Sequence, residues 1–404
     1  MTALITGPAG RFRARTRAFS AGHRSMSIIV GMGLVSVLAM VFPQFGVLQS
    51  TNSWFDAFAN AGVFMLLAMG LNVVVGLAGL LDLGYAAFYA IGAYTYAYSN
   101  SPFSGLNLPF LPMLVVGAAV AAVFGIALGA PTLRLRGDYL AIMTLGFGEI
   151  VPIVFLNLDK WTEGTNGIGG IFRPEELPLL GKFGAITPFP YMVLMLGIVT
   201  LAMILLYRLQ DSRVGRAWMA IREDELAAAA NGINTVTTKL LAFALGATTS
   251  GLAGVFNASK LTIVSPDQFL FTVSFTVLAM VILGGMGNIW GVAAGAFIVY
   301  MIQAVLLKQV NSIVESLGIP PFDIGPLHVD LSEVQFLEYQ FLLFGIALVL
   351  MMLYRPEGLF PSQARRRELH VEADSPEAPE LLGALGESPG SSDDFGESSG
   401  EGVR

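Results

Sequence analysis

The sequence lacks cysteine altogether and has only three histidines among its 404 residues. The absence of cysteine excludes disulfides, thiolate metal sites and a cysteine nucleophile. The histidines, at His23, His328 and His370, all fall outside the apolar runs described below. This placement argues against a haem or a catalytic metal held at membrane depth. We therefore expect no metal site and no residue that does covalent chemistry.

Charged residues are also scarce. They make up 13% of the chain, against about 25% in a soluble globular domain. Hydrophobic residues make up 54%, and the mean hydropathy is +0.68. A chain this apolar cannot bury its excess in one aqueous core, so we expect it to be surrounded by membrane lipid. The net charge of −7 is spread unevenly and does not indicate a nucleic-acid partner.

Ten segments approach the length of about 20 largely apolar residues that a helix needs to cross the hydrocarbon layer. They are 26–48, 57–77, 80–99, 109–130, 138–158, 189–207, 237–260, 269–286, 290–308 and 338–354. The predicted fold is an all-α integral membrane protein, a polytopic bundle of about ten transmembrane helices. Gly-containing stretches at 76–84 and 284–291 interrupt adjacent spans. Each is consistent with a tight turn or with a re-entrant break, which needs protein or a water-filled cavity to cover its backbone.

The placement of Lys and Arg predicts the orientation, because cytoplasmic loops carry the excess of these residues. With a cytoplasmic N-terminus, ten spans return the C-terminus to the same side, so both termini are predicted to be cytoplasmic. All but five of the 22 Lys and Arg residues then lie inside. The five outside are Lys160, Arg173, Lys182, Lys260 and Lys308.

This topology divides the chain into three parts. Residues 1–25 form a basic cytoplasmic N-terminus, 26–357 a transmembrane permease domain, and 358–404 an acidic cytoplasmic tail. The tail is rich in Ser, Gly, Glu and Pro and is predicted to be disordered. The permease domain has polar outer loops at 159–188 and 309–337.

The sizeable inner loop of the permease domain lies at 208–236. Good helix formers dominate Ala217 to Asn231, and Gly232 stands where a helix would stop. The helix is too charged to insert, yet Trp218, Ile221 and Ala229 have near-helical spacing and are suited to pack on the membrane domain. Such a helix is either an ordinary amphipathic connector or a surface that receives force from a cytoplasmic partner.

A longer pattern in this loop resembles a known family. Gly215 to Asn234 reads GRAWMAIREDELAAAANGIN, and it resembles the coupling loop of permeases in the branched-chain amino-acid ABC importers, the LivM type. The chain departs from the general importer signature, Glu-Ala-Ala, because Glu225 is followed by Leu226. Further similar blocks occur in the family's order: GLNVVVGLAGLLDLGYAAFYAIGAY from Gly70, LRGDYLAIMTLGFGEIV from Leu135, TNGIGGI from Thr165, LAMVILGGMGNIWGVAAGAF from Leu278 and YRPEGLF from Tyr354.

The resemblance implies a multi-pass permease of the bacterial plasma (inner) membrane that imports branched-chain or related neutral amino acids, such as leucine, isoleucine and valine. The implied partners are a second homologous permease, two cytoplasmic ATPase subunits and an extracytoplasmic substrate-binding protein. The chain itself is not expected to be an enzyme or to bind a cofactor. It contains no G-x-x-x-x-G-K-[ST] phosphate loop, so partner subunits would use the ATP and Mg²⁺.

Three groups of residues are candidates for function. The ATPase-coupling candidates are Arg216, Arg222, Glu223, Asp224, Glu225 and Gly232. The transport-path candidates are Asn72, Asp82 and Glu149, since an ionisable or polar group at membrane depth is costly and often functional. The candidates for docking the binding protein are Thr165 and Asn166. Turn formation, capping and hydrogen bonding between helices are the alternative roles for the last two groups.

Three other functions are open to a chain of this kind. It could be an ABC permease for urea or short amides, because a permease sequence discriminates substrates poorly. It could be an ion-coupled secondary transporter, which would use an acid such as Glu149 but would have no need of the inner loop. A membrane-embedded enzyme ranks last, because no cluster of His, Asp or Glu gathers at one membrane face.

Overall fold

The structure is a computed structural model. It describes residues 51–132, 138–176, 181–184, 187–306, 322–324, 327–329, 339–355 and 358–360. The basic N-terminus at 1–25, the predicted first span at 26–48 and the tail beyond residue 360 lie outside the described residues. So does most of the outer loop at 309–337.

Long apolar runs form long helices. The described part of the chain has six segments that are long and apolar enough to cross a membrane, and they match predicted spans: Asn52–Leu77, Phe110–Pro131, Asp138–Asn157, Phe189–Gln210, Thr235–Leu261 and Pro266–Gly284. The chain is therefore a polytopic membrane protein. The total of ten spans and the cytoplasmic placement of both termini stay predictions.

The helices that correspond to these segments have the following bounds: α3 Thr51–Asn72, α5 Phe110–Thr132, α6 Asp138–Asn157, α8 Phe189–Gln210, α11 Thr235–Leu261 and α12 Phe271–Gly284. Three further helices are shorter: α4 Ala86–Ser99, α13 Ile289–Met301 and α15 Gln340–Tyr354. A π-helical turn, η5 Ile302–Leu306, continues α13. The expected span at 80–99 is thus wrong in its length, because the helix begins only at Ala86.

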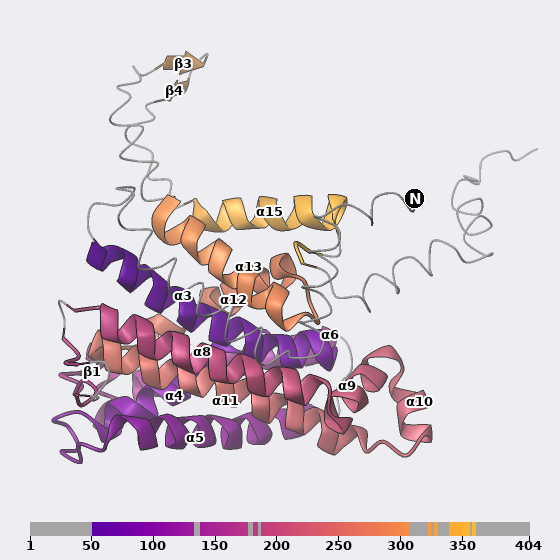
Figure 1. Cartoon of the computed structure of the whole chain (residues 1–404), viewed down its shortest axis with the longest axis horizontal. Coiled ribbons are helices and arrows are strands. Elements are labelled where there is room, and N and C mark those ends of the chain that lie inside the picture. The colour runs from indigo at the N-terminus through magenta and orange to yellow at the C-terminus, as the bar shows by residue number, and fades with distance from the viewer. Residues whose placement is uncertain are drawn as a thin grey trace, which may run out of the picture. The chain divides into compact units, whose positions relative to one another are not determined.

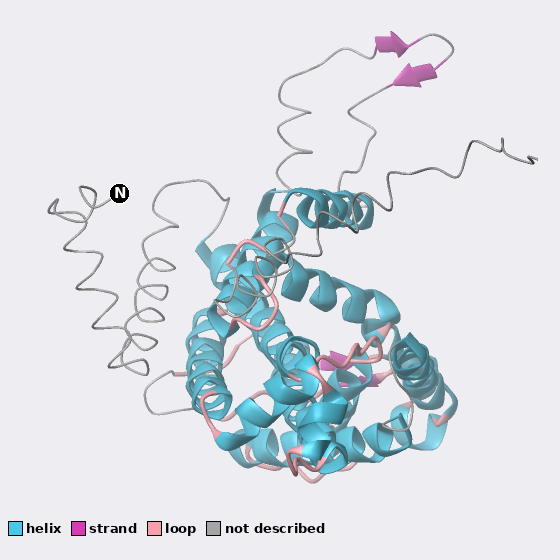
Figure 2. Ribbon diagram, turned by 90° about the vertical axis from the view of Figure 1, so that its right-hand side faces the viewer, coloured by secondary structure: helices cyan, strands magenta, loops and turns pink. Residues whose placement is uncertain are grey.

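Helix α11 lies at the centre of the packing and contacts α3, α4 and α5. Small residues allow close approach there. A Cβ on Gly92 of α4 would lie 2.4 Å from the carbonyl oxygen of Gly251 in α11, and one on Gly254 would lie equally close to the Tyr89 carbonyl oxygen. Helix α13 packs on α3 and α12. Figure 1 shows these helices side-on, and Figure 2 shows most of them nearly end-on.

The two glycine-rich interruptions differ in structure. Only residues 285–288 separate α12 from α13, and Gly285 and Gly287 have φ of 109° and 81°. Glycine reaches such angles without strain, so this interruption is a tight turn. At 76–84, by contrast, α3 passes through the π-helical turn η2 Val73–Leu77 into an irregular segment that ends where α4 begins. This second interruption is a broken helix, and most of it is buried.

Short strands and helical turns join the spans at one end of the bundle. They are α7 Asp159–Thr162, η3 Gly164–Asn166, β1 Ile168–Gly169, β2 Ile263–Val264 and η4 Pro266–Phe269. Strands β1 and β2 pair antiparallel, with Ile168 opposite Val264. A second antiparallel pair, β3 Phe322–Ile324 and β4 Leu327–Val329, belongs to the 309–337 loop. The inner loop that contains α9 Arg213–Glu223 and α10 Glu225–Ala230 lies at the end of the helices opposite β1 (Figure 1).

Candidate functional site: the α9–α10 loop and the broken helix

Helix α9 is fastened to the membrane helices through its apolar side. Ser212 caps it, because its Oγ accepts a hydrogen bond from the Gly215 amide. Trp218 is fully buried, and its Nε1 donates to the carbonyl oxygen of Thr238 in α11 at 2.7 Å. Ile221, one turn later, is also buried. The predicted packing of Trp218 and Ile221 on the membrane domain is therefore confirmed.

The predicted single helix from Ala217 to Asn231 is wrong, because Asp224 interrupts it. The backbone of Asp224 is extended, and its Oδ1 accepts hydrogen bonds from the amides of Leu226 at 2.8 Å and Ala227 at 3.0 Å. This is an N-cap, which starts a second helix in a new direction. The interruption changes the helical phase, so the buried alanine of α10 is Ala228 and not the expected Ala229.

The end of α10 confirms the stop predicted at Gly232. Gly232 has φ of +83°, and the amide of the next residue, Ile233, donates to the Ala228 carbonyl at 3.1 Å. These are features of a left-handed helix cap, for which glycine is the preferred residue. Asn234 then caps α11 by accepting from the Thr237 amide at 3.1 Å.

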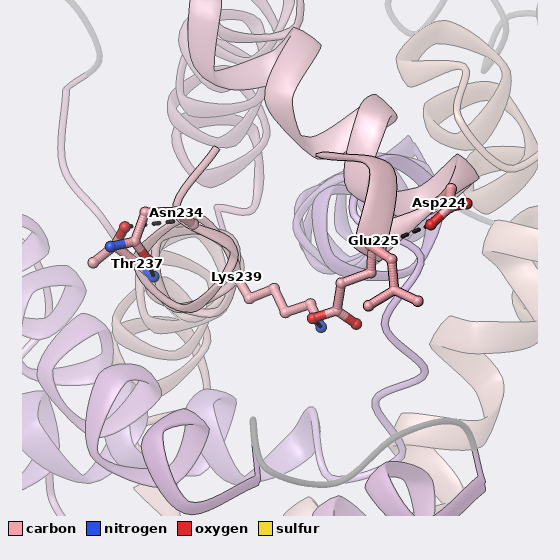
Figure 3. A network of polar contacts seen from close by, with 6 residues as sticks. Asp224, Glu225, Asn234, Thr237 and Lys239 are labelled. Atoms are coloured by element: carbon pink, nitrogen blue, oxygen red, sulfur yellow. Dashed lines mark hydrogen bonds and ion pairs between the residues drawn. The ribbon is translucent and has the colours of Figure 1, made fainter. Parts of the chain in front are cut away.

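An ion pair holds α10 against α11. Lys239 Nζ lies 2.6 Å from Glu225 Oε1, with the lysine side chain 7% exposed and the glutamate 30% exposed. Figure 3 shows the lysine reaching from α11 to the glutamate, beside the cap that Asp224 forms. Glu225 is thus engaged within the chain. Sequence reasoning missed Lys239, because its partner lies on a different helix, 14 positions away.

Arg222 joins α9 to the broken helix. Its Nη1 donates to the Gly76 carbonyl oxygen at 2.7 Å. A Cβ on Gly79 would lie 2.8 Å from Arg222 Cγ, and Gly79 also has φ of +71°, so that position requires glycine. One turn before Gly76, the fully buried Asn72 accepts a hydrogen bond from the Gly287 amide at 2.8 Å. The loop, the broken helix and the 285–288 turn therefore form one continuous set of contacts.

The outward side of the loop has a different character. Leu226 is 68% exposed, and Ala227, Ala229 and Ala230 are exposed beside it. We call these four residues the α10 tip. Arg216, Glu223 and Asp224 are exposed as well, with Arg216 donating to the nearby Asp211 carbonyl at 2.9 Å. An apolar tip next to charged residues can bind a protein partner that covers the leucine.

Asp82 lies in the broken helix and is 2% exposed. Its Oδ1 accepts from the Gly84 amide at 2.9 Å, which is the turn-capping contact that the sequence allowed for. Its Oδ2 is buried without a hydrogen-bond partner among the described residues, beside a small cavity. The cavity is also lined by Gly84, Phe88, Leu128, Gly129, Thr144, Phe147 and Phe243.

The remaining candidates lie apart from this loop. Glu149, in α6, is exposed on the outer side of that helix, whereas the preceding Gly148 is buried against Gly84. Thr165 and Asn166 are exposed in η3, at the opposite end of the bundle from α10. Arg222 connects the loop to the broken helix, in which Asp82 lies and which Asn72 precedes. Glu149 is no part of this connection, and Thr165 and Asn166 lie far from it. The described residues contain no group of acids and histidines that could hold a metal ion.

A family model described as "Branched-chain amino acid transport system / permease component" matches residues 53–352. The chain belongs to this permease family. It is therefore a transport permease component and not an enzyme. The match extends over all the described spans and includes both the α9–α10 loop and the broken helix.

Individual relatives agree with the family match. The LivM permease of the high-affinity branched-chain amino acid transport system of Escherichia coli K12 is 39% identical over 74% of this chain and 68% of its own length. A probable LivM protein of Methanocaldococcus jannaschii is 26% identical over 75% and 91% of the two chains. The ribose import permease RbsC of E. coli K12 is 26% identical over 73% and 87%. No solved structure matches the chain.

Proposed function

We propose that this chain is the permease subunit of an ATP-driven importer that moves branched-chain amino acids, namely leucine, isoleucine and valine, across the bacterial plasma (inner) membrane. The substrate class is drawn from the family description and from the LivM relatives, of which the E. coli K12 protein is 39% identical to this chain, whereas the ribose permease is 26% identical. These relatives do not favour a permease for urea or short amides, or an ion-coupled transporter. An extracytoplasmic binding protein would deliver the substrate, and ATPase subunits would supply the energy.

The observation that carries the coupling mechanism is the two-sided construction of the α9–α10 loop. On the membrane side, Trp218 and Arg222 bond to the backbone of α11 and of the broken helix. On the outward side, the α10 tip presents an exposed leucine. An ATPase subunit that covers the tip could therefore push on α9 and move the broken helix through Arg222. The exposed Glu223 and Asp224 are suited to orient the ATPase electrostatically.

The other partners follow from the same architecture. We infer two ATPase subunits and a second homologous permease, which together would form a symmetric or nearly symmetric transporter. ATP and Mg²⁺ would be bound by the ATPase subunits and not by this chain. Thr165 and Asn166, exposed at the end of the bundle opposite the loop, are the proposed contact for the binding protein. Asn72 and Asp82 are proposed to move with the broken helix during transport.

The test is uptake by vesicles that contain the complete transporter. With the binding protein outside and ATP inside, labelled leucine should accumulate, and unlabelled valine or isoleucine should compete whereas ribose and urea should not. Uptake that is unchanged without ATP, or that depends on an ion gradient instead, would overturn the proposal.

A matched pair of variants tests the coupling surface. Leu226→Asp alters the α10 tip, and we expect the ATPase subunits to co-purify at least tenfold less, with uptake lost in proportion. Val236→Asp alters an apolar residue of similar exposure, 54%, at the start of α11 and outside the tip. It should retain the ATPase subunits. Equal loss in both variants would show that the tip is not the specific contact.

A further inference from the structure

Glu149 is placed unusually for a charged residue in a membrane helix. It lies 11 residues after the first residue of α6 and 8 before the last, so it is far from either end. Other charged residues of the described spans, such as Asp56, Arg208, Lys239 and Lys260, lie at most five residues from a helix end. Glu149 is exposed, and no hydrogen bond or ion pair joins it to another residue that the structure describes.

The surroundings of Glu149 are apolar. Helix positions three, four and seven residues apart share a face, which places Ile142, Gly146, Glu149 and Ile153 along one stripe of α6. Ile142 is 63% exposed and Ile153 is 53% exposed. A carboxylate that faced lipid in such a stripe would cost several kcal/mol, and acids inside membranes instead face protein or water. Among the residues that the structure describes, none supplies a polar neighbour for the stripe, which points to a neighbour outside this part of the chain.

Gly146 gives an independent reason to expect a neighbour. Glycine in a helix interior costs about 1 kcal/mol relative to alanine. At Gly148 that cost has an explanation within the chain, because a Cβ would lie 2.8 Å from Gly84 Cα. At Gly146 a Cβ would meet nothing within 4 Å. A Cβ on Gly197 in α8 or on Gly345 in α15 would also meet nothing within 4 Å, but neither of those helices contains an acidic residue. Small residues in membrane helices allow another helix to approach closely.

From these observations we propose that the α6 stripe packs against a helix of a second, non-identical permease subunit, which presents a hydrogen-bond donor or a cation to Glu149. The proposal rests on the proposed function, in which the transporter contains two permeases. A second copy of this chain fits poorly, since its own stripe has no donor. Tyr139 and Asn157, which are donors near the two ends of α6, lie ten and eight residues from Glu149, about 12–15 Å along the axis.

Photo-crosslinking in membranes that contain the whole transporter tests the surface directly. A benzophenone amino acid at Ile142 or Ile153 reacts with whatever lies beside it, whether protein or lipid. Leu201 and Leu205 of α8, which are 59% and 56% exposed, are the matched control positions. We expect the α6 probes to yield an adduct with a different membrane protein, identified by mass spectrometry, and the α8 probes to yield lipid adducts alone.

Two other crosslinking results would overturn the proposal. Lipid adducts alone at both α6 positions would mean that the stripe faces the bilayer. An adduct of this chain with itself, within one molecule or between two copies, would mean that the chain covers its own stripe, against the charge argument. In either case, ATP-driven leucine uptake by the same membranes would still support the proposed function. Uptake that does not depend on ATP would contradict the proposed function, regardless of which adduct forms.

Substitutions provide a second measurement. Gly146→Leu should reduce co-purification of the second permease at least tenfold, because the leucine fills the space that the partner needs. Gly197→Leu, in an equally open position on α8, should leave it unchanged. Glu149→Gln keeps hydrogen-bonding atoms and should retain the partner better than Glu149→Leu by about fivefold or more. Equal co-purification in all four variants would overturn the proposal.

Discussion

Helices α9 and α10 are consecutive in one loop and are separated by a single residue, yet they are constructed differently. Helix α9 buries Trp218 and bonds to two membrane segments. Helix α10 buries only Ala228, and its one strong tie to the bundle is the ion pair between Glu225 and Lys239. This difference fits the proposed coupling, in which the ATPase subunit contacts α10 and α9 passes the movement to the membrane helices.

Substitutions in the two helices should therefore have different effects. A change in the buried part of α9 should affect the stability of the chain itself. A change in the exposed part of α10, such as Leu226→Asp, should affect partner binding while the chain remains folded.

Trp218→Ala should have the largest effect. Removing a fully buried tryptophan leaves a cavity and removes the hydrogen bond from its Nε1 to the Thr238 carbonyl, with an expected loss of about 3–5 kcal/mol in the free energy of unfolding. Thermal unfolding of the purified chain in detergent measures this loss. Trp218→Phe keeps most of the ring volume and should lose less than half as much. An unchanged unfolding temperature in the alanine variant would mean that α9 is not anchored through this side chain.

Replacing either partner of the Glu225–Lys239 ion pair should destabilise the chain, but by different amounts. Glu225→Gln leaves the buried ammonium of Lys239 without its counter-charge and should cost about 2 kcal/mol. Lys239→Gln leaves Glu225, which is 30% exposed and can be hydrated, so it should cost less. Unfolding measurements on both single variants and the double variant give the coupling energy. The opposite order of the two losses would contradict the burial argument.

Arg222→Gln should separate ATP hydrolysis from transport. The variant loses the charged hydrogen bond to Gly76 but leaves the α10 tip untouched. We expect the ATPase subunits to co-purify normally, while the leucine transported per ATP hydrolysed falls severalfold. Arg213→Gln, which alters an exposed arginine at the first residue of α9 that is not among the coupling candidates, is the control and should behave as the parent chain. A loss of ATPase binding in Arg222→Gln would instead place this arginine at the partner surface.

Asp224→Ala should have the smallest effect on the chain. It removes an N-cap, which is worth about 1 kcal/mol, from a helix of six residues. We expect faster hydrogen exchange at the amides of Leu226 and Ala227, with no change in exchange within α11. Asp224→Asn can still cap and should exchange like the parent chain. If α9 also exchanged faster in the alanine variant, the two helices would be a single cooperative unit.

Much of the membrane fold could be predicted from the sequence, because a long apolar run has few alternatives in a bilayer. The spans at 109–130, 138–158, 189–207 and 237–260 are found with ends shifted by three residues at most. The prediction for 80–99 was wrong in length, since composition does not reveal that residues 80–85 are irregular and that the helix begins only at Ala86. The backbone of that stretch is stabilised by distant groups, such as Thr144 Oγ1, which accepts from the Leu83 amide.

The candidate site was predictable in part. The loop itself and the stop at Gly232 followed from charge, helix propensity and glycine placement. The interruption at Asp224 was hidden, because a charged run such as Arg222 to Glu225 is compatible with a continuous helix. The structure was also needed to tell which charged residues bond within the chain and which are exposed to a partner. Arg222 and Glu225 are bonded within the chain, whereas Glu223 of the same run is exposed.

The sequence by itself determined that the chain is a membrane permease, because the length of its apolar runs, its scarcity of charge and its ordered family blocks are properties of the linear chain. Only the tertiary structure decided how the loop is connected to the transport domain. The bonds from Arg222 to Gly76, from Trp218 to Thr238 and from the Gly287 amide to Asn72 join residues 20 to 215 positions apart. Local propensity contains no information about such pairs, since they depend on how the whole chain packs.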